Sequence, residues 1–254
     1  MKRAAWVAGG LFAAASATLF APTFKEQQRG FPRVEAAYFE KEAALRALFA
    51  EKGVAFPPGR ILIRIFKREH EVEVWASSGR RGPFTRIISY DFLILSGRLG
   101  PKRRKGDGQV PEGFYHINHF NPESRFHLSL GINYPNRSDL ILTAGDDPGA
   151  DIYIHGSFVT IGCVPITDDK IKELYVMALE AVDQGQSRIP VHIYPARLDA
   201  GSYEALRTEF NDEASLLEFW DNLKRGYDLF EQGHALPAIS VSETGKYIFG
   251  RSPV

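Results

Sequence analysis

The chain contains a single cysteine among its 254 residues, and it carries no excess of either charge. One cysteine excludes an internal disulfide, so the packed core alone must hold the fold together. Thirty-one basic side chains balance 31 acidic ones, which excludes a broad electrostatic attraction to nucleic acid or to an anionic membrane. Internal repeats and heptad arrays are also missing, so solenoids and coiled coils are excluded. The length instead predicts one main domain with additions.

Residues 1–21 have the layout of a secretory signal. The basic start MKR precedes an apolar, alanine-rich run from Ala4 to about Phe20. Cleavage is expected after Ala17 or Ala21, although the run is also just long enough to serve as an uncleaved membrane anchor. Both alternatives export the domain. In an oxidising compartment an unpaired thiol is either buried and inert or kept for chemistry.

Apolar periodicity beyond the signal predicts a mostly β body with helices, an α+β fold. The predicted parts are an N-terminal helix at 33–53, a domain at 60–195, and a C-terminal helical extension with a short strand pair at 196–254. Within these, the expected helices cover 33–53, 167–185, 202–210 and 212–230. The expected strands cover a hairpin over 60–77 with its turn at 67–70, then 85–95, 114–118, 125–132, 151–155, 188–194 and a pair within 238–250.

The segment SGRLGPKRRKGDGQVPEG, residues 96–113, is predicted to be a long loop because it has neither a helical nor a strand period. Loops of this length in a compact domain are usually functional or disordered. Five of its residues are cations: Arg98, Lys102, Arg103, Arg104 and Lys105. A solvated basic loop accounts for most of these charges, and a substrate contact by one or two of them is the alternative.

The stretch IHGSFVTIGC, residues 154–163, places the lone Cys163 eight residues after His155. A thiol needs a neighbouring base or positive potential to act as a nucleophile, and His155 is the candidate base. Gly156 lets the chain leave the strand, and the N–H groups of Gly162 and Cys163 are candidates for an oxyanion hole. From spacing alone, a buried, inert cysteine beside a structural histidine is an equally good interpretation.

Three stretches resemble the L,D-transpeptidase catalytic domain family of bacterial cell-wall enzymes. They are the IHG followed by a short loop, a Gly-Cys and a helix; the loop GRLGPKRRKGDGQVPEGFYHI; and GINYPNRSD. The likeness covers about residues 61–194 and implies a β-sandwich or barrel core with a helix after the cysteine. IGCVPITDDKIKELY, the tail EFWDNLKRGYDLFEQ and PAISV are similar to the branch that includes the amidase releasing the major outer-membrane lipoprotein from peptidoglycan.

The resemblance implies that Cys163 is the acyl-accepting nucleophile and that His155 is its proton acceptor and donor. Gly156 and Gly162 are then shape-determining loop positions. Cross-linking members of the family usually read Ser-His-Gly-Cys with an arginine two residues after the cysteine, whereas this chain has Thr160-Ile161-Gly162-Cys163 and Pro165. The missing arginine would have gripped a carboxylate through two hydrogen bonds. Gly156, Thr160, Arg137 and Lys102 are therefore the substrate-binding candidates.

What the resemblance implies about activity is a periplasmic enzyme that acts on the stem peptides of peptidoglycan. Cys163 would form a thioester with the L-centre carbonyl of diaminopimelate. Hydrolysis would then free a murein-bound lipoprotein, while attack by a second amine would form a cross-link or attach the lipoprotein. A non-catalytic wall-binding module that has kept the fold is the alternative from another class.

Two further patterns are interpreted as structural. His116, His119 and His127 lie near one another, but His116 and His119 would point to opposite faces of a strand, and no carboxylate or thiol stands at ligand spacing. Neither a metal nor another cofactor is therefore expected. The aromatic residues Phe219, Trp220, Tyr227 and Phe230 recur at helical spacing, which predicts packing rather than a stacking surface.

Overall fold

The computed structural model describes residues 21–92 and 94–250, and residues 1–20 of the predicted export signal lie outside this part. The fold is α+β, as predicted. One eight-stranded sheet with the order β3-β2-β1-β8-β4-β5-β6-β7 forms its centre, and a separate two-stranded sheet joins β9 to β10.

The strands are β1 (Arg60–Phe66), β2 (Glu71–Ser77), β3 (Thr85–Asp91), β4 (Gly113–Asn121), β5 (Ser129–Ile132), β6 (Tyr153–His155), β7 (Val164–Pro165), β8 (Pro190–Tyr194), β9 (Ala238–Val241) and β10 (Tyr247–Gly250). The helices are α1 (Phe24–Arg29), α2 (Pro32–Glu51), α3 (Arg137–Leu142), α4 (Asp168–Asp183), α5 (Ala200–Glu209) and α6 (Ala214–Gly233).

Strands β1 and β2 form the predicted hairpin and are buried on both faces. Side chains alternate across a strand, so the isoleucines Ile61, Ile63 and Ile65 enter the main core while Leu62 and Phe66 point to the opposite side. A strand with only one buried face would carry polar residues at every second position. The sequence RILIRIF therefore marks the place where the sheet is covered from both sides.

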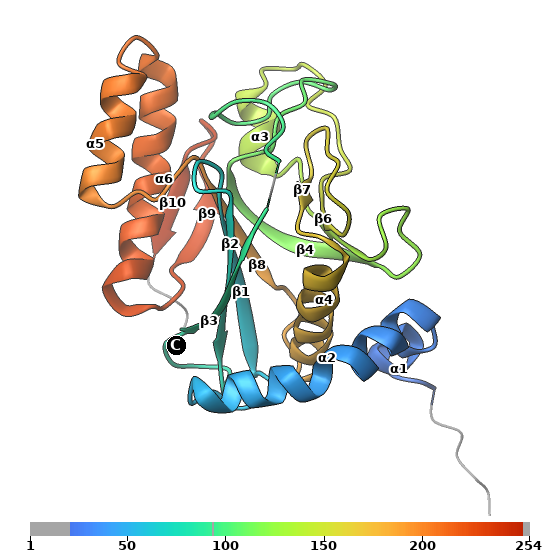
Figure 1. Cartoon of the computed structure of the whole chain (residues 1–254). Coiled ribbons are helices and arrows are strands. Elements are labelled where there is room, and N and C mark those ends of the chain that lie inside the picture. The colour runs from blue at the N-terminus through green and yellow to red at the C-terminus, as the bar shows by residue number, and fades with distance from the viewer. Residues whose placement is uncertain (1–20, 93, 251–254) are drawn as a thin grey trace, which may run out of the picture.

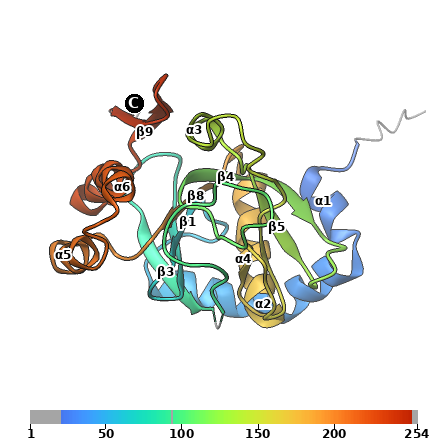
Figure 2. The ribbon, with the colours of Figure 1, turned by 90° about the horizontal axis from the view of Figure 1, so that it is seen from above.

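The main core lies inside the curl of the sheet, around α4. Figure 2 shows the sheet bending around this helix, and Figure 1 shows α2 lying across the end of the β1–β3 strands. Buried residues of α4 such as Leu174 and Ala178 pack with β1, β2, β5 and β8. Helix α4 begins three residues after β7, so its position in the core fixes where the strand that follows Cys163 runs.

The outer face of the sheet is covered by the C-terminal extension, which comprises α5, α6 and the β9–β10 pair (Figure 1). Trp220 and Phe230 of α6 are fully buried, which confirms that the helical aromatics serve in packing. Trp220 and Tyr227 share one aromatic cluster with residues of β1, β4 and β8, namely Phe66, Phe114 and Tyr194. The extension is therefore packed against the sheet through a common core.

Two short helices, α1 and α3, were not predicted. Each begins with a capping box, in which Thr23 or Asn136 exchanges hydrogen bonds with the residue three positions later. A six-residue helix is too short to show an apolar period, so the cap is its main sequence signal. Helix α3 places Asp139 beside the long loop 96–112.

Candidate active site

The strand β6 ends at His155, and Cys163 directly precedes β7. The two strands pair in parallel, with Ile154 opposite Val164 and His155 opposite Pro165. The chain therefore leaves the end of β6 at Gly156 and crosses back to the start of β7, which lies beside the start of β6, rather than reversing as a hairpin. Cys163 directly precedes the residue paired with Ile154, so it lies beside the start of β6, whose last residue is His155.

Gly156 lies where no side chain fits. A Cβ built there would stand 2.5 Å from an Asp168 carboxylate oxygen and 2.6 Å from the Phe126 carbonyl oxygen. The Asp168 carboxylate sits at the start of α4 and accepts a hydrogen bond from the Ser157 amide at 2.7 Å. Gly156 thus allows the loop after β6 to be attached to the first turn of the helix that follows Cys163.

His155 is 1% exposed, and its ring is held by one hydrogen bond and by one stacked aromatic ring. Its Nδ1 lies 2.5 Å from the carbonyl oxygen of Gly156, so Nδ1 carries the proton and donates it there. Phe126 stacks on the imidazole at a centroid distance of 4.6 Å. The remaining nitrogen, Nε2, is left as the proton acceptor. Burial lowers the pKa of His155, so the ring is neutral at pH 7.

Cys163 is half-buried, and its thiol donates a hydrogen bond to the carbonyl oxygen of Asp151 at 3.6 Å. Burial raises the pKa of this thiol, and the negative charge of Asp151 acts in the same direction. A backbone hydrogen bond from Tyr153 and the positive charge of Lys102 oppose the shift without reversing it. The resting site therefore holds a neutral thiol and a neutral imidazole.

The loop before the nucleophile is braced by Thr160. Its hydroxyl accepts a hydrogen bond from the Cys163 amide and donates one to the Cys163 carbonyl, each at 2.8 Å. Gly162 has φ +123, and a Cβ there would stand 3.1 Å from the Gln109 carbonyl, so a side chain would be strained. The amide of Cys163 is thus already bonded in this state, and the predicted oxyanion hole is left with the Gly162 amide as its candidate donor.

A pocket of about 290 Å³ opens above the thiol, and both predicted catalytic residues line it. The pocket is formed by the turn between β4 and β5, by β5 and β6, and by the residue before β7. Its lining residues are Asn121, Ser124, Arg125, Phe126, Ser129, Asp151, Tyr153, His155 and Cys163. The predicted nucleophile and the predicted base therefore line one accessible cavity, an arrangement that acyl transfer at a carbonyl requires.

The predicted substrate-binding cations lie elsewhere. Lys102 is 5% exposed, and its ammonium group binds the Asp107 carboxylate at 2.6 Å and the Arg104 carbonyl at 2.8 Å. Its charge reaches the thiol, but its side chain does not line the pocket. Arg137 is exposed at the first turn of α3 and is also outside the pocket lining. Their roles in substrate binding stay predictions.

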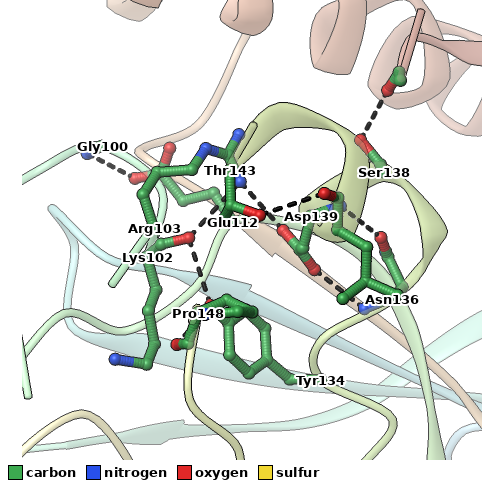
Figure 3. A network of polar contacts seen from close by, with 12 residues as sticks. Gly100, Lys102, Arg103, Glu112, Tyr134, Asn136, Ser138, Asp139, Thr143 and Pro148 are labelled. Carbon is green, nitrogen blue, oxygen red and sulfur yellow. Dashed lines mark hydrogen bonds and ion pairs between the residues drawn. The ribbon is translucent and has the colours of Figure 1, made fainter. Parts of the chain in front are cut away.

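Most cations of the long loop are bound within the protein. Arg98 pairs with Glu213 and Lys105 with Asp147, while Arg103 reaches the buried Asp139 at 3.0 Å. Figure 3 shows Arg103 directed toward Asp139, with the amine of Lys102 pointing away from this network. The loop is thereby fixed to α3 and to the C-terminal extension, so its charge serves mainly to position it.

A buried ion pair anchors the end of the same loop and was not predicted. The ammonium of Lys67 lies 2.9 Å from Glu112, and both side chains are fully buried. Glu112 also accepts hydrogen bonds from the Trp220 indole at 2.7 Å and from the Gly100 amide at 2.7 Å. Charged residues in a turn and a loop give no sequence signal of burial. This cluster joins the C-terminal extension to the loop that contacts Gly162.

Sequence reasoning also missed the residues that line the pocket on either side of the thiol. Arg125 was assigned to a strand that in fact begins only at Ser129, and Asp151 was assigned to the strand that begins at Tyr153. Arg125 lies in a turn, and Asp151 lies in the loop that leads into β6, both at the pocket. Within residues 21–92 and 94–250, no group of three or more His, Cys, Asp or Glu side chains is placed to hold a metal ion. In the same part of the chain, no helix is long and apolar enough to cross a membrane.

Comparison with known proteins agrees with this geometry. Residues 60–193 match the model of the L,D-transpeptidase catalytic domain, YkuD. A relative from Escherichia coli K12, named "Putative L,D-transpeptidase YafK", is 36% identical over 194 residues, which are 75% of this chain and 74% of that protein. The chain therefore belongs to the L,D-transpeptidase catalytic domain family, a family of peptidoglycan-acting enzymes, and the resemblance found in the sequence is confirmed.

Solved structures resemble the chain only distantly. The helical cell shape determining protein Pgp2 from Campylobacter jejuni is 18% identical with a TM-score of 0.43, and the match covers 72% of this chain and 73% of Pgp2. L,D-transpeptidase 1 from Mycobacterium tuberculosis is 13% identical with a TM-score of 0.29, covering 53% of this chain and 61% of that one. The family assignment depends on the sequence matches and not on these structures.

Proposed function

We propose that this protein is a cysteine acyl-transfer enzyme of the cell wall that opens an amide bond at the L-centre carbonyl of diaminopimelate in peptidoglycan stem peptides. The observation that carries the proposal is the joint lining of one accessible pocket by Cys163 and His155, with the proton of His155 held at Nδ1. A structural histidine or an inert cysteine would not need an open cavity above both side chains.

The first half of the reaction follows from the two neutral groups. As the sulfur of Cys163 bonds to the carbonyl carbon, Nε2 of His155 takes the thiol proton. The oxygen becomes negative and is placed near the amide of Gly162. Collapse of the tetrahedral intermediate breaks the C–N bond, and the departing amine takes the proton from Nε2. A thioester on Cys163 remains, and His155 is neutral again.

The second half decides which product is made. If water attacks the thioester, His155 removes its proton, the thiol is restored, and the net reaction is amide hydrolysis. If the amine of another stem or of a lipoprotein attacks, the net reaction is a new amide bond. We propose hydrolysis of the bond between murein and a lipoprotein as the main reaction, with cross-linking or lipoprotein attachment as the second candidate.

The loop between Gly156 and Cys163 supports a polypeptide as the leaving group. Its side chains Phe158, Val159 and Ile161 are 60%, 47% and 91% exposed. Three large apolar side chains within four positions of one loop are costly to leave in water unless a partner covers them. A stem peptide is short and polar, whereas a protein attached to it would bring apolar side chains over this loop.

The proposed location is the periplasm. The sequence layout of residues 1–21 and the envelope substrate of the family support it, because the polymer that carries diaminopimelate lies outside the inner membrane. The absence of internal disulfide partners for Cys163 is compatible with a thiol kept for chemistry in that compartment.

A carbapenem tests the mechanism directly, because it acylates an activated cysteine and stays attached. The intact protein should gain the mass of one inhibitor molecule, and Cys163→Ala should gain none. The matched control is Ser129→Ala, which removes another polar pocket residue and should leave the adduct in place. A wild-type protein that takes up no inhibitor, or a Cys163→Ala variant that takes up as much as wild type, would refute the cysteine mechanism.

The reaction products separate hydrolysis from cross-linking. Sacculi that carry bound lipoprotein should release free lipoprotein when incubated with wild type and none with Cys163→Ala. Cross-linking would instead appear as new diaminopimelate-to-diaminopimelate bonds without free lipoprotein. A wall-binding module without catalysis would bind sacculi and change neither fraction.

A further inference from the structure

Two oppositely charged side chains flank the candidate nucleophile and are unused by the proposed mechanism. Arg125 and Asp151 both line the pocket that contains Cys163, and both are exposed. Among residues 21–92 and 94–250, neither side chain forms an ion pair or a hydrogen bond with another residue. By contrast, Arg98, Lys102 and Arg103 of the long loop are all paired within the protein.

Arg125 is presented by a turn that the rest of the protein holds in place. It follows Ser124, and the guanidinium of Arg33 from α2 donates hydrogen bonds to the carbonyl oxygens of Ser124 and His127 at 2.7 and 2.8 Å. The Phe126 amide also donates to the Ser124 hydroxyl at 3.1 Å. The backbone on both sides of Arg125 is therefore fixed. The entropy cost of binding a ligand here is limited to ordering the Arg125 side chain itself.

Asp151 is fixed on the other segment of the pocket. Its backbone has φ +62, and its carbonyl oxygen accepts the hydrogen bond of the Cys163 thiol. Burial raises the pKa of that thiol, and the negative charge of Asp151 adds to the shift. The pocket therefore offers one guanidinium and one carboxylate around the position of the reacting carbonyl.

Diaminopimelate has a matching pair of charges. Once its L-centre carbonyl faces the sulfur, the far end of its side chain carries a second amino-acid centre with a free ammonium and a free carboxylate. The strand that follows Cys163, β7, consists of Val164 and Pro165 and carries no cation. A guanidinium that grips a carboxylate must therefore come from another element, and Arg125 is the arginine that lines the pocket.

We propose that Arg125 and Asp151 form a subsite for the zwitterionic D-centre of diaminopimelate, with Arg125 binding its carboxylate and Asp151 its ammonium. This inference rests on the proposed function, because it assumes that the L-centre carbonyl is placed at Cys163. Binding of the ammonium to Asp151 also offsets the negative charge beside the sulfur. The correct substrate thus makes the thiol easier to deprotonate at the moment it is needed.

The test compares two synthetic tripeptides that bear a lysine amide on the L-centre carbonyl of their third residue. One has diaminopimelate at that position, and the other has lysine, which keeps the ammonium but lacks the D-centre carboxylate. We expect Arg125→Ala to lower kcat/KM about 10-fold for the diaminopimelate peptide and to leave the lysine peptide unchanged, since only the first loses a charged hydrogen bond. Arg81→Ala, which removes an exposed arginine between β2 and β3 and outside the pocket, should change neither.

Asp151→Asn is expected to act on the other charge. It should slow the diaminopimelate peptide about 10-fold relative to the same peptide with its D-centre amine acetylated, because removal of the charge beside the sulfur affects both peptides alike. Equal losses for all peptides, or no loss in either variant, would overturn the subsite.

Equilibrium binding separates this inference from the mechanism. In the Cys163→Ala background, calorimetry should show weaker binding of the diaminopimelate peptide when Arg125 is also replaced by alanine. If binding discriminates the two peptides as expected while the wild type releases no lysine, the subsite stands and the proposed hydrolysis fails. If Cys163→Ala binds both peptides equally, the subsite fails whatever the activity.

Discussion

Burial disfavours the charged form of both predicted reacting groups, the buried His155 and the half-buried Cys163. It lowers the pKa of His155 and raises that of Cys163, so the pair is neutral over a wide range around pH 7. Many cysteine enzymes instead store a thiolate and an imidazolium before substrate arrives. In the proposed mechanism the proton moves only when a carbonyl is in place, which protects the thiol from oxidants until then, because the thiolate is the reactive form.

The rate of alkylation by iodoacetamide should reveal this protonation state. Because the pKa of Cys163 is raised above its ordinary value of 9.0, the rate should rise with pH and reach its midpoint above 9. The measurement is a pH series of alkylation rates followed by intact mass. A plateau of fast alkylation with a midpoint below 7 would instead show a stored ion pair and would contradict the neutral resting site.

The hydroxyl of Thr160 is expected to position the nucleophile. Thr160→Val keeps the shape but removes both hydrogen bonds to the Cys163 backbone, so kcat should fall about 10-fold while the folded state persists. Thr208→Val is the matched control, because that hydroxyl bonds only to the Glu204 carbonyl within α5. Equal activity of Thr160→Val and wild type would show that the loop keeps its geometry without this brace.

At the scale of elements, the strands and longer helices followed from periodicity, and the short elements did not. The Ile and Val residues of β1 and β2 alternate regularly, and α4 and α6 are long enough to repeat an apolar face. Helix α3 and the turn that carries Arg125 are too short for any period. The motif IHGSFVTIGC was enough to predict that His155 and Cys163 act together. Arg125 lines the pocket only because β4 and β5 pair as an antiparallel hairpin, which the sequence did not reveal.

Helix α3 buries Asp139, and this burial should leave a signature in the pH dependence of stability. It raises the pKa of Asp139 to about 6, from an ordinary 3.8, so the folded chain keeps a proton that the unfolded chain has lost. The resulting stability is present below pH 3.8 and is lost as the pH rises through 6. Relative to Asp139→Asn, the unfolding free energy of wild type should fall by about 2–3 kcal/mol over that interval. Urea denaturation at several pH values measures it, and a difference that rises instead would contradict the shift.

At the scale of the whole molecule, Glu112 joins the C-terminal extension to the long loop 96–112. Trp220→Phe removes the indole N–H and leaves one oxygen of this buried carboxylate without a donor, which should cost about 1–3 kcal/mol of unfolding free energy. Tyr203→Phe is the matched control, since it also removes one donor from the extension but its acceptor, Asp221, is solvated. Chemical denaturation compares the two. Equal stabilities would mean that Lys67 and Gly100 satisfy Glu112 on their own.

The aromatic cluster shared by the sheet and the C-terminal extension determines the shortest segment of the chain that can fold and be active. Phe66 and Phe114 belong to the segment that matches the family model, and Tyr194 directly follows it, yet Trp220 and Tyr227 cover all three. A chimaera that transplanted only residues 60–195 would expose these aromatic side chains to water and would lose the hydrogen bond from Trp220 to Glu112 at the end of the long loop. Swapping that segment alone between relatives should therefore yield aggregation-prone, poorly ordered proteins. A swap that also includes the C-terminal extension should yield folded ones.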